Sequence, residues 1–374
     1  MSYPKAHFQL YLGDKDITER IDDRLVSLSL SEAREDSADQ LEIKLDDSDG
    51  LFALPGVGHR LKLNLGWDPN SLVEKGIFII DEVNHEGAPD TISIKARSAE
   101  LNKPIRTRRD RSFHDTTLGK LVAAIAKDNK LLLRMSESLK EIKISHLDQH
   151  NESDLHFLTR LGKEHDAVTT IKKDRLLFLS INEGKNSQGN SLPVIEIHRS
   201  QGDKHHYHTA SRDNYSGVSA QWHDTKEAKL QQLTVGKTSD SKQLRRVFPS
   251  KQAANQAAKS EMHRVNRNKA TLSFSLALAR PDISPMSVVR FTGIKAPISQ
   301  IDWLVKKVSH SLSGKGFTTQ LEMETKANAL DKKSNQDKSK EKEMGDDDKD
   351  ESNNVGEKDL EKEGQNQSNG KFDE

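Results

Sequence analysis

The sequence predicts a mainly β protein with an α+β insertion and a disordered C-terminal tail. Two-residue alternation of apolar and polar side chains runs through residues 1–110 and returns after residue 200. Helical spacing replaces it in between, and sustained apolar patterning ends near residue 326. Alternation is typical of strands with one buried face, and a three-to-four-residue period is typical of amphipathic helices.

Residues 1–110 are predicted to form the first β-domain. The alternation puts apolar side chains on one face of each strand and polar ones on the other. The run at 77–80 is apolar throughout and predicts a central strand. Glycine and aspartate turns separate the strands, which favours a small barrel or sandwich. The alternating sets are Val26, Leu28 and Leu30; Leu41, Ile43 and Leu45; Leu61, Leu63, Leu65 and Trp67; and Ile92, Ile94 and Ala96.

Residues 111–200 are predicted to form an α+β segment. Apolar residues at helical spacing over 118–125 predict a helix capped by Asp115, Thr116 or Thr117. A second helix is predicted over 155–161, with Asn151 or Ser153 as its cap. Strand-like runs follow at 168–171 and 176–181.

Residues 201–326 are predicted to form a second β-domain with one helix. Alternation is clear in three sets, and Ser250 can cap an alanine-rich helix. The two β-domains are of similar size, although no direct sequence repeat relates them. The alternating sets are Val218, Ala220 and Trp222; Leu272, Phe274, Leu276 and Leu278; and Phe317, Thr319, Leu321 and Met323.

Residues 327–374 are predicted to be disordered. They contain 15 Asp and Glu residues against 9 Lys, whereas the preceding 326 residues have a net charge of +6. Their few apolar residues could not offset a backbone ordering cost of roughly 1–2 kcal/mol per residue.

Composition excludes several classes of site. The 374 residues include no cysteine, so disulfides, thiolate metal sites and cysteine nucleophiles are excluded. The formal net charge of zero argues against a dedicated nucleic-acid binder. No signal peptide and no apolar run of about 20 residues is visible, so we expect a soluble protein made in the cytoplasm without a membrane span.

Two histidine groups are candidates for metal sites. In the run 205–208 only His206 and His208 could share an ion, because neighbouring strand residues face opposite sides. A polar loop or edge strand is the simpler interpretation. His146 and His150 have the spacing of two ligands on one helix face, but the local pattern predicts a strand followed by a loop. We therefore predict no metal and no cofactor.

Catalytic motifs are equally weak. The sequence Gly236-Lys237-Thr238 resembles the end of a phosphate-binding loop, but Gln231 stands where that loop needs glycine. Asp81 and Glu82 adjoin a strand and should point to opposite sides, which is poor geometry for acid–base catalysis. The basic run 106–111 could bind phosphate or an acidic partner, and a solvated connector is the favoured interpretation. We predict no catalytic residues and no enzyme.

Five segments in order resemble the late control D protein family of contractile-tailed phages. Residues 23–47 resemble its opening strand pair, and 106–126 its basic connector and first helix. Residues 152–167 resemble its second helix, 219–229 the strand that opens its second barrel, and 250–293 its later helix, long strand and proline-rich turn. The resemblance covers about residues 1–326; the tail has no counterpart.

The resemblance implies a tail hub, similar to the hub part of type VI secretion spike proteins. It implies two tube-like β-barrel domains (1–110 and 201–326) flanking the α+β segment (111–200), and a homotrimer whose six barrels make a pseudo-sixfold ring. That ring would join the tail tube protein to a separate spike protein, with the tape-measure protein as a further candidate partner and DNA only as passing cargo. The implied location is the virion tail, assembled in the bacterial host cytoplasm.

Two alternatives remain open at this stage. The chain could be the hub of a phage-like puncturing particle or a type VI-like system, which shares the fold. It could instead be a tail-associated cell-wall hydrolase, for which only residues 111–200 offer room. That segment shows no acid–base signature.

Overall fold

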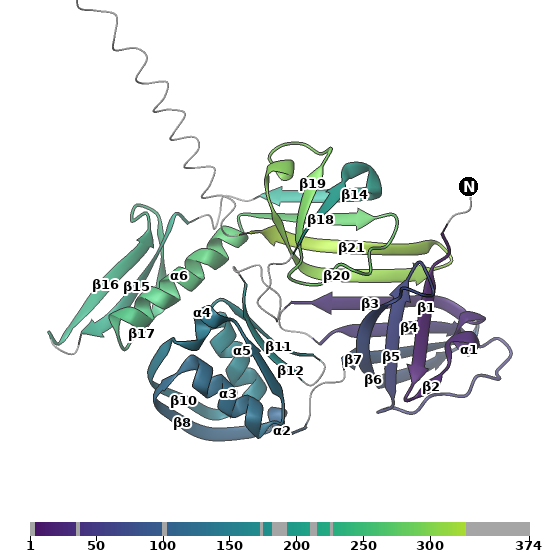
Figure 1. Cartoon of the computed structure of the whole chain (residues 1–374), viewed down its shortest axis with the longest axis horizontal. Helices are drawn as coiled ribbons and strands as arrows, with labels where there is room; N and C mark the ends of the chain where they lie inside the picture. Colours follow the sequence, from purple (N-terminus) through teal and green to yellow (C-terminus); the bar gives the residue numbers. More distant parts are fainter. Residues whose placement is uncertain are drawn as a thin grey trace, which may run out of the picture. The chain divides into compact units, whose positions relative to one another are not determined.

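The computed structural model describes residues 4–34, 38–98, 103–172, 175–181, 193–209, 215–224 and 227–326, which belong to one compact unit (Figure 1). The tail predicted to be disordered, 327–374, lies outside the described residues. The mainly β character predicted from alternation is confirmed, as are the helices of the α+β insertion.

The N-terminal part consists of strands with one buried face. In β4, Leu41, Ile43 and Leu45 are buried and the residues between them are not, as the alternation predicted. Val26 is an exception, 43% exposed, because a bulge between Leu25 and Ser27 interrupts the pairing of β3 with β4. The elements are β1 (His7–Leu12), β2 (Lys15–Asp16), α1 (Thr18–Asp22), β3 (Leu25–Ala33), β4 (Gln40–Asp46), β5 (Arg60–Gly66), β6 (Val73–Glu86) and β7 (Thr91–Ser98).

The predicted central strand at 77–80 lies inside β6, between β5 and β7. Its burial nevertheless alternates, since Phe78 and Ile80 are buried whereas Ile77 is 40% exposed. An unbroken apolar run therefore does not mean here that both faces of the strand are covered.

The middle part has its own core between two small sheets and two longer helices. Thr117 and Ser153 are the N-caps of α3 and α5, each accepting a backbone N–H bond, so one of the proposed caps is confirmed for each helix. Strand β10 pairs with β8, and β12 lies between β11 and β9. The elements are α2 (Lys103–Arg106), β8 (Arg108–Thr117), α3 (Leu118–Asp128), β9 (Leu132–Met135), α4 (Glu137–Lys140), β10 (Lys143–Ser153), α5 (Asp154–Glu164), β11 (Ala167–Lys172) and β12 (Arg175–Ser180).

The C-terminal part contains two separate cores. Helix α6, capped by Ser250 as predicted, covers the three-stranded sheet β16–β15–β17 (Figure 1). Strands β18 to β21 build the other core around Phe274, Phe291 and Trp303. The elements are β13 (Val194–His198), η1 (Arg199–Gln201), β14 (Gly202–Thr209), β15 (Gly217–Asp224), β16 (Lys229–Gly236), β17 (Ser241–Phe248), α6 (Lys251–Arg267), β18 (Ala270–Leu276), β19 (Val288–Thr292), η2 (Ile298–Gln300), β20 (Trp303–Ser313) and β21 (Gly316–Thr325).

Strand β18 is shorter than its alternation predicted. It ends at Leu276, and Leu278 is 56% exposed. The chain leaves the sheet after Leu276. Three residues on, the carbonyl oxygen of Ala279 accepts a hydrogen bond of 2.7 Å from Trp67 Nε1 in the N-terminal part.

One sheet, antiparallel along its central path, joins the N-terminal and C-terminal parts. Its order through the centre is β18–β21–β20–β3–β4–β7, so β3 lies beside β20 (Figure 1). Leu28 is the register partner of Leu312, and Leu30 that of His310. Ala279 and Phe317 from the C-terminal part pack into the N-terminal core. The order is symmetric about the β3–β20 contact. On one side β20 pairs with β21, which pairs with β18; on the other side β3 pairs with β4, which pairs with β7.

Candidate functional site

The histidine run 205–208 lies on the edge strand β14, as the simpler interpretation predicted. His206 and His208 are on one face of it, with ring centroids 6.4 Å apart. Within the described ranges, no three His, Cys, Asp or Glu side chains are grouped so that they could hold a metal ion together.

The loop predicted around His146 and His150 is not present. The strand predicted to give way to a loop continues as β10 to Ser153, so both histidines lie on it. His146 is the register partner of His114 on β8. His150 Nδ1 lies 2.8 Å from Asp110 Oδ1 instead.

The prediction that Asp81 and Glu82 face opposite sides is wrong. A bulge between Ile80 and Glu82 adds a residue to β6, so both carboxylates line one shallow hollow on the sheet. Each has a cation beside it: Asp81 Oδ2 lies 2.7 Å from Arg97 Nε, and Glu82 Oε2 lies 3.4 Å from Lys95 Nζ. Exposed, paired carboxylates of this kind are not poised for proton transfer.

The basic run 106–111 is largely exposed, as predicted, but it is not a connector. From Arg108 it forms strand β8, paired with β10. Arg111 points inward, where its Nη2 binds the fully buried Asp154 and its Nη1 lies 2.9 Å from Asp128 Oδ2. Asn129 and Gln149 also donate to Asp154, at 2.8 and 2.9 Å. Arg111 therefore neutralises a buried carboxylate at the start of α5.

The segment at Gly236 is a sheet turn. Gly236 ends β16 with φ +88°, and a Cβ there would lie 2.5 Å from the carbonyl oxygen of Ser216. The glycine is required by close strand packing. No helix begins after it, since the chain continues into β17.

A buried ionic cluster connects four elements that are distant in sequence. Arg34 at the end of β3 donates from Nη1 to Glu324 Oε1 of β21 at 2.7 Å. Arg267 at the end of α6 lies 2.9 Å from the same oxygen through Nε, and binds Asp166, between α5 and β11, with Nη1 at 2.7 Å. All four side chains are at most 5% exposed. We call Arg34, Asp166, Arg267 and Glu324 the ionic junction.

The ionic junction is electrostatically satisfied. Burial alone raises the pKa of Asp166, but hydrogen bonds from His263 and Arg267 and their charges outweigh it and lower that pKa to about 2. Asp166 therefore stays ionised at neutral pH. Removing one partner of a buried pair leaves an uncompensated charge, which is strongly destabilising.

A second buried pair lies on the central sheet. Lys75 Nζ is 2.6 Å from Glu32 Oε2 and 3.0 Å from the carbonyl oxygen of Pro281. Burial raises the pKa of Glu32, but His310 and Lys75 outweigh this and lower it to about 2. Both pairs were missed by sequence reasoning. The only local signal is a charged residue, Glu32, interrupting the Ser/Leu alternation of β3.

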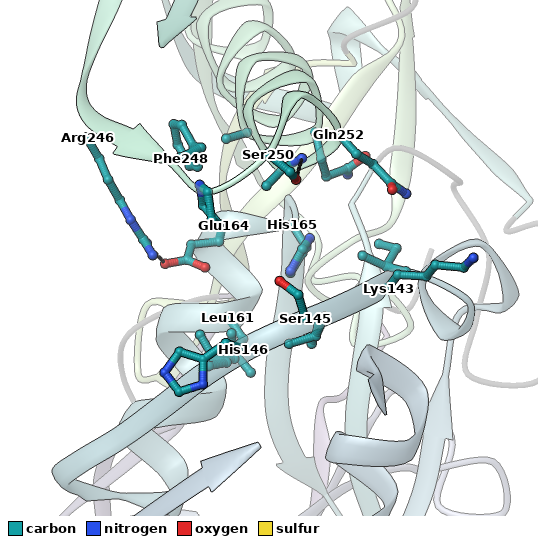
Figure 2. A pocket seen from close by; sticks show the side chains of 17 residues that line it. Lys143, Ser145, His146, Leu161, Glu164, His165, Arg246, Phe248, Ser250 and Gln252 are labelled. Atoms are coloured by element: carbon teal, nitrogen blue, oxygen red, sulfur yellow. Dashed lines mark hydrogen bonds and ion pairs between the residues drawn. The ribbon is translucent and has the colours of Figure 1, made fainter. Parts of the chain in front are cut away.

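One hollow lies between β10, α5 and the β17–α6 corner (Figure 2). Its volume is about 160 Å³. Leu161 and Phe248 line it, and Arg246 reaches across to Glu164 with Nη1 2.7 Å from Oε1. An ion pair already spans it, and among its described lining residues no hydrogen bond joins a hydroxyl to an imidazole. We interpret it as a gap in the packing between the middle part and the sheet β16–β15–β17 with its helix α6.

Three strongly exposed apolar side chains lie on the segment between β4 and β5. Leu51 is 78% exposed, Leu54 58% and Val57 66%. An exposed apolar group of this kind marks a contact surface more often than a catalytic one. We call residues 51–57 the apolar segment.

Comparison with known proteins identifies the family. The profile of the phage tail baseplate hub family (GPD) matches residues 38–316. A probable baseplate hub protein of Escherichia phage 186 is 38% identical over 360 residues, covering 85% of this chain and 92% of the relative. The corresponding protein of Escherichia phage P2 is also 38% identical, over 359 residues, covering 85% and 93%. The chain belongs to the phage tail baseplate hub family.

Solved structures share the fold at low identity. The 43 kDa tail protein of prophage MuSo2 from Shewanella oneidensis superposes with a TM-score of 0.62 at 11% identity, covering 87% of this chain and 99% of that one. A tail protein from Neisseria meningitidis gives 0.61 at 14%, covering 85% and 96%. The E. coli type VI secretion component c3393 gives 0.50 at 12%, covering 85% and 76%.

These findings confirm the predicted family and the predicted role as a baseplate hub protein of the phage virion tail. The relatives found are structural proteins of the baseplate. In the described part of the chain, no helix is both long and apolar enough to cross a membrane.

Proposed function

We propose that three copies of this chain form a ring that joins the tail tube to the spike. The observation that carries the proposal is the symmetric order of the central sheet, with β18–β21–β20 on one side and β3–β4–β7 on the other. Two comparable β-modules in each copy would give six modules in a trimer. Such a ring can present sixfold geometry to the tube and threefold geometry to the spike.

The proposed modules correspond to the tube-like barrels expected over 1–110 and 201–326, with 111–200 between them and 327–374 as a charged extension. Because β15–β17 and α6 have a core of their own, we assign only β13, β14 and β18–β21 to the second module. The ionic junction supports this division, since it connects both modules to the middle part and to α6.

The apolar segment is the proposed contact with a neighbouring subunit or with the tube. A permanent assembly buries apolar side chains that a free chain would leave in water. The action we propose is mechanical: the ring caps the tube, holds the spike and releases it on contraction, and DNA and the tape-measure protein pass through its lumen. Relatives at 38% identity are phage proteins, which favours a phage tail over a secretion particle.

Co-expression with the cognate tube and spike proteins tests the proposal. Sedimentation and light scattering should give a complex with three copies of this chain per spike trimer. A chain that remains monomeric with both partners present would refute the ring. Peptidoglycan turnover that disappears on a single carboxylate substitution would instead support the hydrolase alternative.

A further inference from the structure

Two histidines on neighbouring strands face each other with unusual proximity. His114 on β8 and His146 on β10 are register partners, and their ring centroids are 4.7 Å apart. Their Nδ1 atoms are separated by 3.1 Å. Both side chains are exposed, so an ion from solvent could reach the space between them.

Asp148 fixes the orientation of one of the two rings. Its Oδ2 lies 3.0 Å from His146 Nε2, and its Oδ1 accepts from Ser112 Oγ at 2.7 Å. The carboxylate can only accept, so Nε2 of His146 carries the hydrogen, and in the neutral imidazole Nδ1 has a free lone pair. His114 Nδ1 lies 3.1 Å from that atom.

The spacing of the two nitrogens suits a shared metal ion. Zinc–imidazole bonds are about 2.0–2.1 Å long, so two nitrogens on one ion lie about 2.9 Å apart at a right angle and about 3.4 Å apart at the tetrahedral angle. The observed 3.1 Å falls between these values. A carboxylate on the far nitrogen of a ligating imidazole is also the usual outer partner of such a ligand, because it fixes the ring and raises its basicity.

We propose that His114 and His146 chelate a divalent transition-metal ion such as Zn²⁺ through their Nδ1 atoms, with Asp148 and Ser112 positioning His146. Since no third His, Cys, Asp or Glu converges there among the described residues, water completes the coordination. The ion would clip β8 to β10. Imidazole suits Zn²⁺ and Ni²⁺ but not Mg²⁺, which prefers oxygen ligands.

The test is calorimetric titration of the untagged full-length chain with Zn²⁺, Ni²⁺ and Mg²⁺. We expect a single saturable site for the first two ions and none for Mg²⁺. His114→Ala and His146→Ala should each abolish that site. Asp148→Asn should weaken it about tenfold, the lower end of what losing an outer carboxylate partner costs.

A matched control removes two histidines from another strand. The double variant His206→Ala/His208→Ala takes two histidines from the edge strand β14 and should leave the site intact. Saturating Zn²⁺ should raise the unfolding temperature of the wild type and of this control, but not of His146→Ala. Histidine ¹⁵N spectra of the wild-type chain, which need no variant, should show Zn²⁺ shifting the Nδ1 signals of His114 and His146.

Three results would overturn the proposal. One is the absence of a saturable Zn²⁺ site, which would leave the 3.1 Å contact as an imidazole–imidazole hydrogen bond. Another is loss of binding in the His206→Ala/His208→Ala control with retention in His146→Ala. The third is a Zn²⁺-induced shift confined to other histidines. None of them bears on the hub role, because the site lies within the β8–β10 pair alone.

Discussion

Arg34 and Glu324 form a buried ion pair across 290 residues of chain, with Nη1 2.7 Å from Oε1. Arg34 directly follows β3, and Glu324 lies on β21. Arg267 lies 2.9 Å from the same carboxylate oxygen and also binds Asp166, so two guanidinium groups face two carboxylates. The contact holds the N-terminal and C-terminal parts together beside the sheet that they share.

Removing Glu324 should therefore be severely destabilising. Glu324→Ala leaves Arg34 and Arg267 short of a buried countercharge, and we expect the free energy of unfolding to fall by about 3–5 kcal/mol in urea titrations. Glu322→Ala is the matched control, on the same strand but exposed and 3.8 Å from Lys307, and should cost at most about 1 kcal/mol. Equal effects of the two substitutions would contradict the role given to the junction.

Acid should loosen the ionic junction at Asp166. The pKa of Asp166 is lowered from 3.8 to about 2, so its stabilisation is complete above the unfolded value and is lost as pH falls toward the folded one. We expect the free energy of unfolding to drop by on the order of 2 kcal/mol from this group between about pH 5 and pH 2. Asp166→Asn should be less stable at pH 7 yet show a shallower loss in that window. An unchanged slope would place the acid sensitivity elsewhere.

Gly162 should resist a substitution that helix propensity favours. A Cβ there would lie 2.7 Å from both the carbonyl oxygen of Ala167 and Oγ1 of Thr169, so Gly162→Ala forces α5 away from β11. We expect a loss of about 1–3 kcal/mol in unfolding free energy rather than the gain of up to about 1 kcal/mol typical of an open helix position. Gly314→Ala, with open space around it, is the control and should stay within about 0.5 kcal/mol. A stabilised Gly162→Ala protein would refute this packing.

The apolar segment should matter for assembly and not for folding. Changing Leu51, Leu54 and Val57 together to Ser should leave the unfolding transition within about 0.5 kcal/mol, because these side chains are in water in the free chain. Sedimentation with tube and spike proteins should show weakened ring formation. Leu132→Ser, at a site 65% exposed on β9, is the control and should assemble normally. Full assembly of the triple variant would remove the segment from the interface.

Local patterns predicted the elements well, because they depend on neighbouring residues. Alternation located β4 and β21, and capping chemistry located the starts of α3, α5 and α6 at Thr117, Ser153 and Ser250. Two residue-level predictions failed at bulges, at Val26 and at Asp81, because one inserted residue reverses the faces of the strand residues beyond it.

Local sequence patterns could not predict which side chains pair between distant segments. Nothing near Arg34 indicates that its partner is Glu324, and nothing in the run 106–111 indicates that Arg111 turns inward to Asp154. The pairing of His114 with His146 depends on strand register, which sequence spacing alone does not give. These contacts form only when distant strands align. The sequence signals them only through an isolated charged residue in an otherwise regular strand pattern.

The pairing of β3 with β20 also sets an order of events during synthesis. At about 5–20 residues per second, β3 emerges from the ribosome roughly 15–55 s before its partner at residues 303–313 exists. Its edge faces solvent throughout that interval and is available to strands of other nascent chains. The serines at 27, 29 and 31 and the inward charge of Glu32 make it a poor template for such pairing. A chain truncated before residue 303 would leave that edge permanently unpaired, so these side chains alone would have to prevent aggregation. We expect such a chain to precipitate more than the full-length chain.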